Sequence, residues 1–278
     1  MSDPSRHPHI RIRPSRGWAS LNLAELWSYR DLLLILAGRD VKLRYRQTAL
    51  GVIWVILQPL LAATIFAVVF GLFARLPSDG QPYGLFVLCG LLPWSFISGA
   101  VQRAGNSLVS EARLISKVYF PRLLIPLASS AAVLIDLAVS LLVLALAMAI
   151  YRVAPGWRVL ALPLFVLLGL LLGAGASFWL SALNVRYRDF MYALPFLLQM
   201  WLYASPVVYA SSLVPERWRW LYSLNPAVGV IEGFRWSLLG SDTLTAPMLA
   251  ASTLVGLILF VSGAYFFRRV ERSFADII

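Results

Sequence analysis

One acidic side chain, Asp136, lies deep inside an apolar stretch of this sequence of 278 residues. A carboxylate in such surroundings is costly unless it is paired or neutral, so it marks a candidate functional residue. Proton transfer would be one role for it. A proton relay, however, needs a series of ionisable groups, and no other Asp, Glu or His lies deep in an apolar stretch. We therefore expect Asp136 to have a structural, hydrogen-bonded role.

Other side chains that could perform chemistry do not occur in catalytic or metal-binding patterns. A phosphate-binding P-loop requires Gly-x-x-x-x-Gly-Lys-[Ser/Thr], and neither of the two lysines, Lys42 and Lys117, follows a glycine. His7 and His9 lie in a polar arm, where we expect them to be solvated, and Cys89 is the single cysteine. The sequence therefore predicts a protein that is not an enzyme, with no catalytic residue, metal site or cofactor of its own.

Any functional site in this chain must be positioned by its six apolar stretches. They run roughly over 50–74, 83–102, 123–150, 159–183, 190–209 and 247–267. Each has close to the ~20 apolar residues that cross a ~30 Å hydrocarbon layer as a helix. Hydrophobic residues make up 60% of the chain and charged residues 13%, and the mean hydropathy is +0.76. We predict an all-α polytopic membrane protein whose six transmembrane helices fill residues 49–278.

The basic residues predict how these helices are oriented. The net charge is +11, and in so apolar a chain an anionic membrane surface explains it better than nucleic acid does. The Lys and Arg residues outside the stretches number 18 on one side of the membrane and 6 on the other. The positive-inside rule therefore places both termini in the cytoplasm, as an even number of spans requires.

Two segments precede the first stretch. Residues 1–21 are expected to form a flexible cytoplasmic arm, and residues 22–48 an amphipathic helix on the inner membrane surface. The side chains expected to reach lipid phosphates and headgroups are Arg39, Lys42, Arg44, Tyr45 and Arg46. This helix is either a basic anchor that fixes topology or a gate that leads into the first span.

The segment between the second and third stretches predicts a short helix in the cytoplasm. Asn106 or Ser107 would cap this helix, and Glu111 would lie in its first turn, near the positive end of the helix dipole. Its apolar stripe and flanking charges are Leu108, Ala112, Arg113, Ile115, Lys117 and Tyr119. Such a helix either docks into a groove of a partner protein or lies on lipid.

Residues 210–246 are too polar to span a membrane and are rich in aromatic side chains. We expect two short helices, 214–221 and 226–239, with Pro226 in a first turn and Gly240 at a C-terminal stop. The spacing of Glu232 and Arg235 favours an ion pair. The side chains expected at the outer interface are Trp218, Trp220, Phe234 and Trp236. These helices either anchor the chain at that interface or close an exit.

Proline and glycine inside the stretches predict bends and close contacts. Gln58-Pro59 would bend the first span and place a polar side chain at the bend. Gly169-x-x-x-Gly173, followed by Gly175, permits the close approach of another helix. That helix could belong to this chain or to a second copy of it.

Four segments, taken together, form a pattern that covers most of the chain. They are YRDLLLILAGRDVKLRYRQTALGVIWVILQPLL (29–61), NSLVSEARLISKVYFPRLLIPLA (106–128), LNVRYRDF (183–190) and LNPAVGVIEGFRWSLLG (224–240). In content and order they resemble the permease subunit of ATP-binding-cassette exporters of the type-two class. The most similar branch exports lipid-linked polysaccharides such as O-antigen, capsule and teichoic acid.

The resemblance implies a homodimer in the bacterial inner membrane, with two separate ATPase subunits that bind ATP and Mg. It implies that 106–119 is a coupling helix that contacts the ATPase and that 30–47 is a cytoplasmic gate. It implies a channel lined by Trp54, Gln58, Tyr192, Phe196, Gln199 and Tyr203. A periplasmic gate would contain Trp218, Trp220, Glu232, Phe234, Arg235 and Trp236.

Three functions remain open at this stage. The leading hypothesis is translocation of an undecaprenyl-linked glycan across the inner membrane, powered by the partner ATPase. The second is a membrane-bound enzyme that acts on lipid-linked sugar. The third is a type-two exporter of small hydrophobic molecules.

Overall fold

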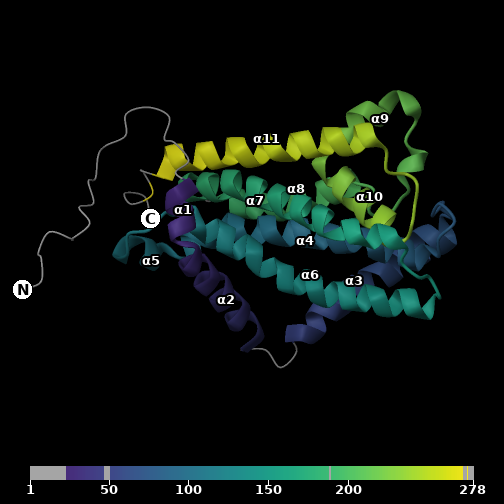
Figure 1. Ribbon diagram of the computed structural model, residues 1–278, viewed down its shortest axis with the longest axis horizontal. Coiled ribbons are helices and arrows are strands. Elements are labelled where there is room, and N and C mark those ends of the chain that lie inside the picture. Colours follow the sequence, from purple (N-terminus) through teal and green to yellow (C-terminus); the bar gives the residue numbers. More distant parts are fainter. Residues whose placement is uncertain (1–22, 47–50, 188, 272–273, 275–278) are drawn as a thin grey trace, which may run out of the picture.

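The computed structural model describes residues 23–46, 51–187, 189–271 and 274. Over these residues every regular element is a helix, which confirms that the fold is all-α. The long helices run side by side, with α1 and the C-terminal end of α11 at one end of the bundle and α9 and α10 at the other (Figure 1). The predicted arm, 1–21, lies outside the described residues.

Five helical segments among the described residues are long and apolar enough to cross a membrane: Ile53–Phe73, Tyr83–Ser110, Leu124–Ile150, Trp157–Arg186 and Ala246–Val270. The first combines α3 (Gly51–Phe66) with a π-helical continuation, η1 (Ala67–Phe73). The second, third and fifth are α4 (Tyr83–Ser110), α6 (Leu124–Ile150) and α11 (Ala246–Val270). The fourth joins a short 3₁₀ turn, η2 (Trp157–Ala161), to α7 (Leu162–Arg186).

The stretch predicted as a span over 190–209 forms a shorter helix, α8 (Phe190–Tyr203), of 14 residues. At 1.5 Å per residue α8 is about 21 Å long, less than a ~30 Å hydrocarbon layer. The helix ends early because the Asn225 side chain donates hydrogen bonds to Ala204 O and to Ser205 Oγ, each at 3.0 Å. Pro206 also has no N–H with which to continue the helical ladder.

The central helix is α4, which packs against α3, α6, α7, α8 and α10. The predicted glycine motif on α7 serves this packing within the chain. A Cβ at Gly173 would lie 2.8 Å from the Cβ of Ala100 on α4, and one at Gly175 would lie 2.7 Å from the Cα of Phe260 on α11. Because side chains larger than glycine would overlap these atoms, both contacts require glycine. The motif therefore packs α7 between α4 and α11.

The two short helices predicted before the last span are confirmed as α9 (Glu216–Ser223) and α10 (Pro226–Leu238). Asn225 caps α10 by accepting a hydrogen bond from the Ala227 N–H at 3.1 Å, and Gly240 follows its end with φ +70°. Pro226 occupies its first turn, as expected. However, α10 is buried almost completely between α4, α7 and α11, and does not lie on the outer surface.

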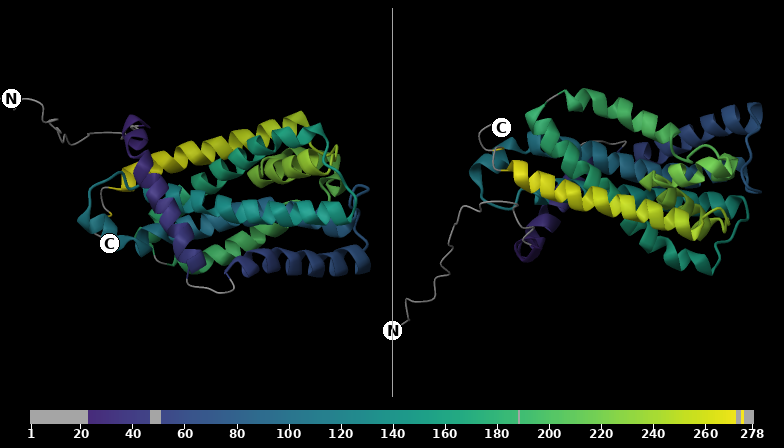
Figure 2. Two further views of the ribbon diagram at one scale, coloured as in Figure 1. Left: turned by 60° about the horizontal axis from the view of Figure 1, so that its bottom comes forward. Right: turned by 90° about the horizontal axis from the view of Figure 1, so that it is seen from above.

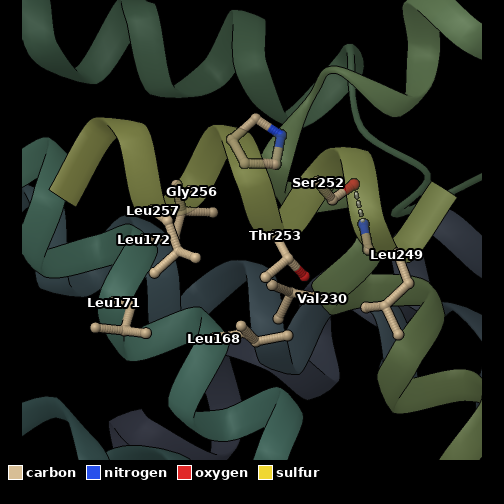
Figure 3. Close-up of a pocket in the computed structure, with 11 residues that line it drawn as sticks. Leu168, Leu171, Leu172, Val230, Leu249, Ser252, Thr253, Gly256 and Leu257 are labelled. Carbon is tan, nitrogen blue, oxygen red and sulfur yellow. Dashed lines mark hydrogen bonds between the residues drawn. The ribbon is translucent and has the colours of Figure 1, made fainter. Parts of the chain in front are cut away.

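A hydroxyl on α11 holds α10 in this position. Ser252 Oγ accepts a hydrogen bond from the Gly229 N–H at 3.1 Å and donates to the carbonyl of Ser223, also at 3.1 Å. The neighbouring cavity between α7, α10 and α11 has a volume of only about 10 Å³, and apolar side chains such as Leu172 and Val230 line it (Figure 3). This volume holds one water molecule at most, so the junction is tightly packed.

Tight packing around α10 predicts a sharp response to one added methyl group. A Cβ at Gly233 would overlap the buried ring of Phe165, whereas a Cβ at Gly256 on α11 meets no atom within 4 Å. We expect Gly233→Ala to destabilise the protein by roughly 1–3 kcal/mol through overpacking. Gly256→Ala should be neutral or stabilising, because alanine favours the helix. Thermal unfolding in detergent measures both, and equal melting temperatures for the two variants would contradict the prediction.

Candidate functional site

The segment predicted as one amphipathic helix over 22–48 forms two helices, α1 (Leu23–Ser28) and α2 (Arg30–Arg46). The longer of them, α2, packs along α6 and crosses the bundle obliquely (Figure 2). Ionisable side chains gather where α2, α4 and α6 meet. We call this group the charged seam; its members are Arg39, Asp40, Arg44, Arg103, Glu111 and Asp136.

Asp136 on α6 is at the centre of the charged seam. Its carboxylate pairs with Arg44 of α2, accepts a hydrogen bond from the Tyr45 hydroxyl at 2.6 Å, and binds Arg103 of α4 at 2.9 Å. The carboxylate side chain is only 14% exposed. Donors from two other helices thus converge on it, which confirms the expected hydrogen-bonded role and compensates the cost of burying its charge.

Tyr45 remains a hydrogen-bond donor over the whole physiological pH range. Burial, followed by its hydrogen bond to Asp136, raises the pKa of the Tyr45 phenol to about 12. Because the phenol stays protonated below that pH, it does not lose this contact when the pH changes within the cell. Tyr45 therefore keeps the proton that it donates to Asp136 over this pH range.

A second cluster of the charged seam joins α2 to the break after α4. Arg39 donates to both carboxylate oxygens of Glu111, at 2.6 and 3.1 Å, and to Asp40 at 3.0 Å. Burial opposes the charged form of Arg39, but its hydrogen bonds to Glu111 and Asp40 outweigh burial and raise the pKa of the guanidinium. Asp40 in turn accepts from Ser129 Oγ of α6 at 3.0 Å. A fork-shaped Arg–carboxylate contact fixes orientation as well as distance.

A polar groove of about 520 Å³ runs beside both clusters. It is lined by Asp40, Leu43, Arg44, Arg103, Ser107, Ser110, Glu111, Ser129 and Ala132. Charges of both signs and several hydroxyl groups therefore border space that water can enter.

The structure divides the basic side chains of α2 between contacts within the protein and the surface. Arg39 and Arg44 face the protein, whereas the apolar residues Leu34 and Ile35 are exposed. Lys42 is exposed as expected, and the side chain of Arg46 lies outside the described residues. Amphipathic spacing separates a polar from an apolar face, but it does not determine which face meets the protein. In a membrane, the apolar face can meet lipid, and the polar face then turns inward.

Sequence reasoning missed three partners in the charged seam: Arg103, Asp40 and Ser129. One signal could have identified Arg103, because a carboxylate buried in a span requires a cation, and Arg103 is the first cation after the apolar run of α4. No comparable signal identifies the hydrogen bond between Ser129 and Asp40, since it forms only through the crossing of α2 over α6.

The predicted coupling helix begins later than expected. Helix α4 continues without a break through Asn106 and Leu108 to Ser110, so neither Asn106 nor Ser107 caps a new helix. After Glu111 follows the six-residue helix α5 (Ala112–Lys117). The helix extends because Asn106 faces α7 and accepts a hydrogen bond from Asn184 at 3.0 Å, which favours continued packing.

The two sides of this region have different surroundings. Leu108 and Ile115 of the predicted stripe are buried in the chain's own core, and Ala112 is half-buried. The exposed side chains at the tip include Arg113, Lys117 and Tyr119, and Tyr119 is 81% exposed. The exposed surface of this region is therefore a small tip with basic and aromatic side chains, while Leu108 and Ile115 of the apolar stripe pack internally.

The predicted channel residues are exposed on two helices of the single chain, α3 and α8. On α8, Leu194 and Leu198 point into the core, while Tyr192, Phe196, Gln199 and Tyr203 are exposed. Their shared face is confirmed. Trp54 and Gln58 of α3 are exposed as well. No second wall covers these side chains within the described residues, so one chain alone does not enclose a channel with them.

The predicted outer gate divides into an exposed and a buried part. Trp218 and Trp220 of α9 are exposed and Trp236 is half-buried, as expected for an interface. Phe234, in contrast, is fully buried, because α10 inserts into the bundle. The predicted ion pair is confirmed: Arg235 donates to Glu232 at 2.9 Å, and both side chains are about 1% exposed.

Arg235 connects three parts of the core through its guanidinium. It donates to the carbonyl of Val207 at 2.9 Å, and its Cζ lies 3.6 Å from the centre of the Phe86 ring on α4. Gly90 leaves room for it, since a Cβ there would lie 2.7 Å from Arg235 Nη2. Glu232 also accepts a hydrogen bond from Thr243. The buried pair thus holds the segment after α8 against α4 and α10.

No group of three or more His, Cys, Asp or Glu side chains that could hold a metal ion occurs among the described residues. The charged seam offers ion pairing and hydrogen bonding.

Removal of the Asp136 carboxylate should release α2. Asp136→Ala leaves the guanidiniums of Arg44 and Arg103 facing each other, and breaking a buried pair costs up to roughly 3–5 kcal/mol, less where water enters. We expect hydrogen exchange of the α2 amides to accelerate at least about tenfold. The matched control is Asp31→Ala, an acid of the same helix that is 81% exposed. Unchanged protection of α2 in Asp136→Ala would contradict the assignment.

Comparison with known proteins is consistent with this architecture. Residues 31–239 match the family model described as ABC-2 type transporter. Over 250 residues the chain is 29% identical to the O-antigen export system permease protein RfbA of Klebsiella pneumoniae, covering 89% of this chain and 95% of the relative. It is 31% identical over 255 residues to the protein of the same name from Myxococcus xanthus, covering 91% and 97%.

A further relative is the polysialic acid transport protein KpsM of Escherichia coli, which is 24% identical over 240 residues and covers 84% of this chain and 91% of the relative. Each comparison thus extends over most of both sequences. Because the family model also covers more than half of the sequence, this chain belongs to the ABC-2 type transporter family.

Proposed function

We propose that this chain is the membrane permease of an ATP-driven exporter that moves a lipid-linked polysaccharide across the bacterial inner membrane. The observation that carries the proposal is the nearly full-length similarity to proteins named for O-antigen export and polysialic acid transport. The missing P-loop supports it, because a chain without a nucleotide site needs separate subunits to bind ATP and Mg.

The proposed topology has six crossings, with both termini in the cytoplasm. The distribution of Lys and Arg supports this orientation. Helix α8 supplies the sixth crossing, because the chain must return from the end of α7 to α9 at the opposite end of the bundle (Figure 1). The segment after Tyr203 would complete the distance that α8 alone does not cover.

A second copy of the chain would complete the channel. Helices α3 and α8 both pack on α4 and expose aromatic and amide side chains on their outward faces. In a homodimer these faces would line a shared path. Aromatic faces suit sugars, since they contact the C–H surfaces of the rings without requiring one hydrogen-bond pattern, so that a long glycan could slide along them.

The contact between Arg39 and Glu111 would transmit movement of the ATPase to α2. Glu111 immediately precedes α5, whose exposed tip is the proposed docking point for the ATPase. Movement of that tip would pull on Arg39 and shift α2 relative to α4 and α6. The pyrophosphate of an undecaprenyl-linked glycan would compete with Glu111 and Asp136 for the guanidiniums of Arg39 and Arg44, so pair opening and headgroup binding would be linked.

Deletion of the gene tests the function directly. We expect a deletion strain to accumulate lipid-linked polysaccharide on the cytoplasmic side of the inner membrane, and the wild-type chain to restore export. The measurement is surface polysaccharide, together with cleavage of the lipid-linked polymer by an added glycan-cleaving enzyme in inverted and in right-side-out vesicles. Normal surface polysaccharide in the deletion strain would refute the proposal.

Charge reversal tests the route through Arg39. Arg39→Glu and Glu111→Arg should each reduce export at least about tenfold, because like charges then face each other across the contact. The double variant, which restores an opposite pair, should recover a large part of the activity. Asp31→Arg, an exposed reversal on α2, should leave export close to wild type. A double variant no better than either single one, at equal amounts in the membrane, would contradict the route.

A further inference from the structure

An apolar groove lies at the outer end of the bundle, away from the charged seam. We call it the outer groove; it has a volume of about 570 Å³. Its walls come from the last turns of α6, from the connection that follows it through η2, from the start of α7 and from the end of α10, and include Leu141, Met148, Val159, Leu162 and Leu238. The groove opens on the surface of the bundle, and none of the chemistry described above uses it.

The residue at one edge of the outer groove has a backbone conformation that L-residues rarely adopt. Arg152 lines the groove and has φ +58°. It follows the end of α6 in a Schellman motif: the Val153 N–H bonds to Met148 O at 2.9 Å, and the Arg152 N–H bonds to Ala149 O at 3.2 Å. Glycine normally occupies this position because it has no Cβ. Arginine adopts this conformation at a cost in conformational free energy that glycine would not incur.

The guanidinium of Arg152 is not used within the part of the chain that the structure describes: it makes no ion pair there, and its side chain is exposed. The neighbouring Arg158 differs, since it pairs with Asp242 at 2.8 Å. A costly backbone position is thus combined with an exposed cation at the edge of an apolar groove. Strain of this kind commonly accompanies binding sites.

Neighbouring side chains place the outer groove at the boundary between hydrocarbon and headgroups. Tyr151 and Trp157, on either side of the turn, are 50% and 76% exposed, and such aromatic residues favour this boundary. The apolar walls therefore lie at acyl-chain depth and Arg152 at headgroup depth. An occupant must combine an apolar chain with an anion at one end.

We propose that the outer groove binds a glycerophospholipid of the surrounding membrane, with one acyl chain between α6 and α7 and its phosphate on the guanidinium of Arg152. Such a lipid matches the groove in charge and in depth. Its acyl chain lies in the hydrocarbon, where the apolar walls are, and its phosphate lies at the headgroups, where Arg152 is. Arginine contacts a phosphate through two parallel N–H donors, which suits this role. In the orientation proposed above, the lipid belongs to the outer leaflet.

Two variants test the phosphate and acyl contacts separately. Arg152→Gly removes the cation and places the residue that the Schellman motif favours, so the fold should be preserved. Ala145→Phe places a ring in the groove, where Ala145 is exposed. The matched control is Arg75→Gly, because Arg75 also has a positive φ, +51°, and is exposed, but does not line the groove.

The experiment measures phospholipid retained by the purified chain in detergent, and the rise in melting temperature when phosphatidylglycerol or undecaprenyl phosphate is added. We expect Arg152→Gly and Ala145→Phe each to retain at least about fivefold less phospholipid than wild type. Each should also lose most of the rise in melting temperature that phosphatidylglycerol causes. Arg75→Gly should behave like wild type in both measurements. Retention equal to wild type in both groove variants would overturn the proposal. Stabilisation by undecaprenyl phosphate alone, dependent on Arg152, would overturn it too and assign the groove to the glycan carrier.

These measurements need neither ATPase subunits nor polysaccharide. A negative result would therefore leave the proposed export function unaffected, and a failure of that function would leave the lipid site standing.

Discussion

Buried charges in this apolar bundle must be compensated by partners, and that requirement fixes the positions of two helices. Asp136 on α6 brings Arg44 and Tyr45 of α2 and Arg103 of α4 to one point. Apolar packing alone would not hold α2 there, because several of its apolar side chains face outward. The pair of Glu232 and Arg235 acts likewise on α10, which it connects to the segment after α8.

These ion pairs combine with a rigid framework of closely packed helices. Glycines at 173 and 175 bring α7 into direct contact with α4 and α11, and Gly233 brings α10 against Phe165. Close packing of this kind resists gradual deformation. Movement is therefore expected in the parts held by polar contacts that can exchange partners, above all α2 at the charged seam. The exposed tip after Glu111 lies directly beside one of those contacts.

Local chemistry made several elements predictable from the sequence. The hydropathy of the long stretches identified five helices of spanning length, and Pro226, Asn225 and Gly240 mark the ends of α10 in the usual way. The spacing on α8 correctly placed Tyr192 and Phe196 on one face. Errors arose where distant contacts decided the outcome: Asn184 favours the continuation of α4 past Asn106, and Asn225 ends α8 at Tyr203.

The residues and their order are enough to show that this chain is helical, that most of it is apolar enough for a membrane, and that Asp136 needs a partner. The identity of those partners, Arg44, Tyr45 and Arg103, and the inward orientation of the charged face of α2 depend on how the helices pack. The two kinds of property differ in the sequence distance over which they arise. Helix formation and hydropathy depend on neighbours within a few turns, whereas an ion pair between residues 92 positions apart depends on how whole helices cross.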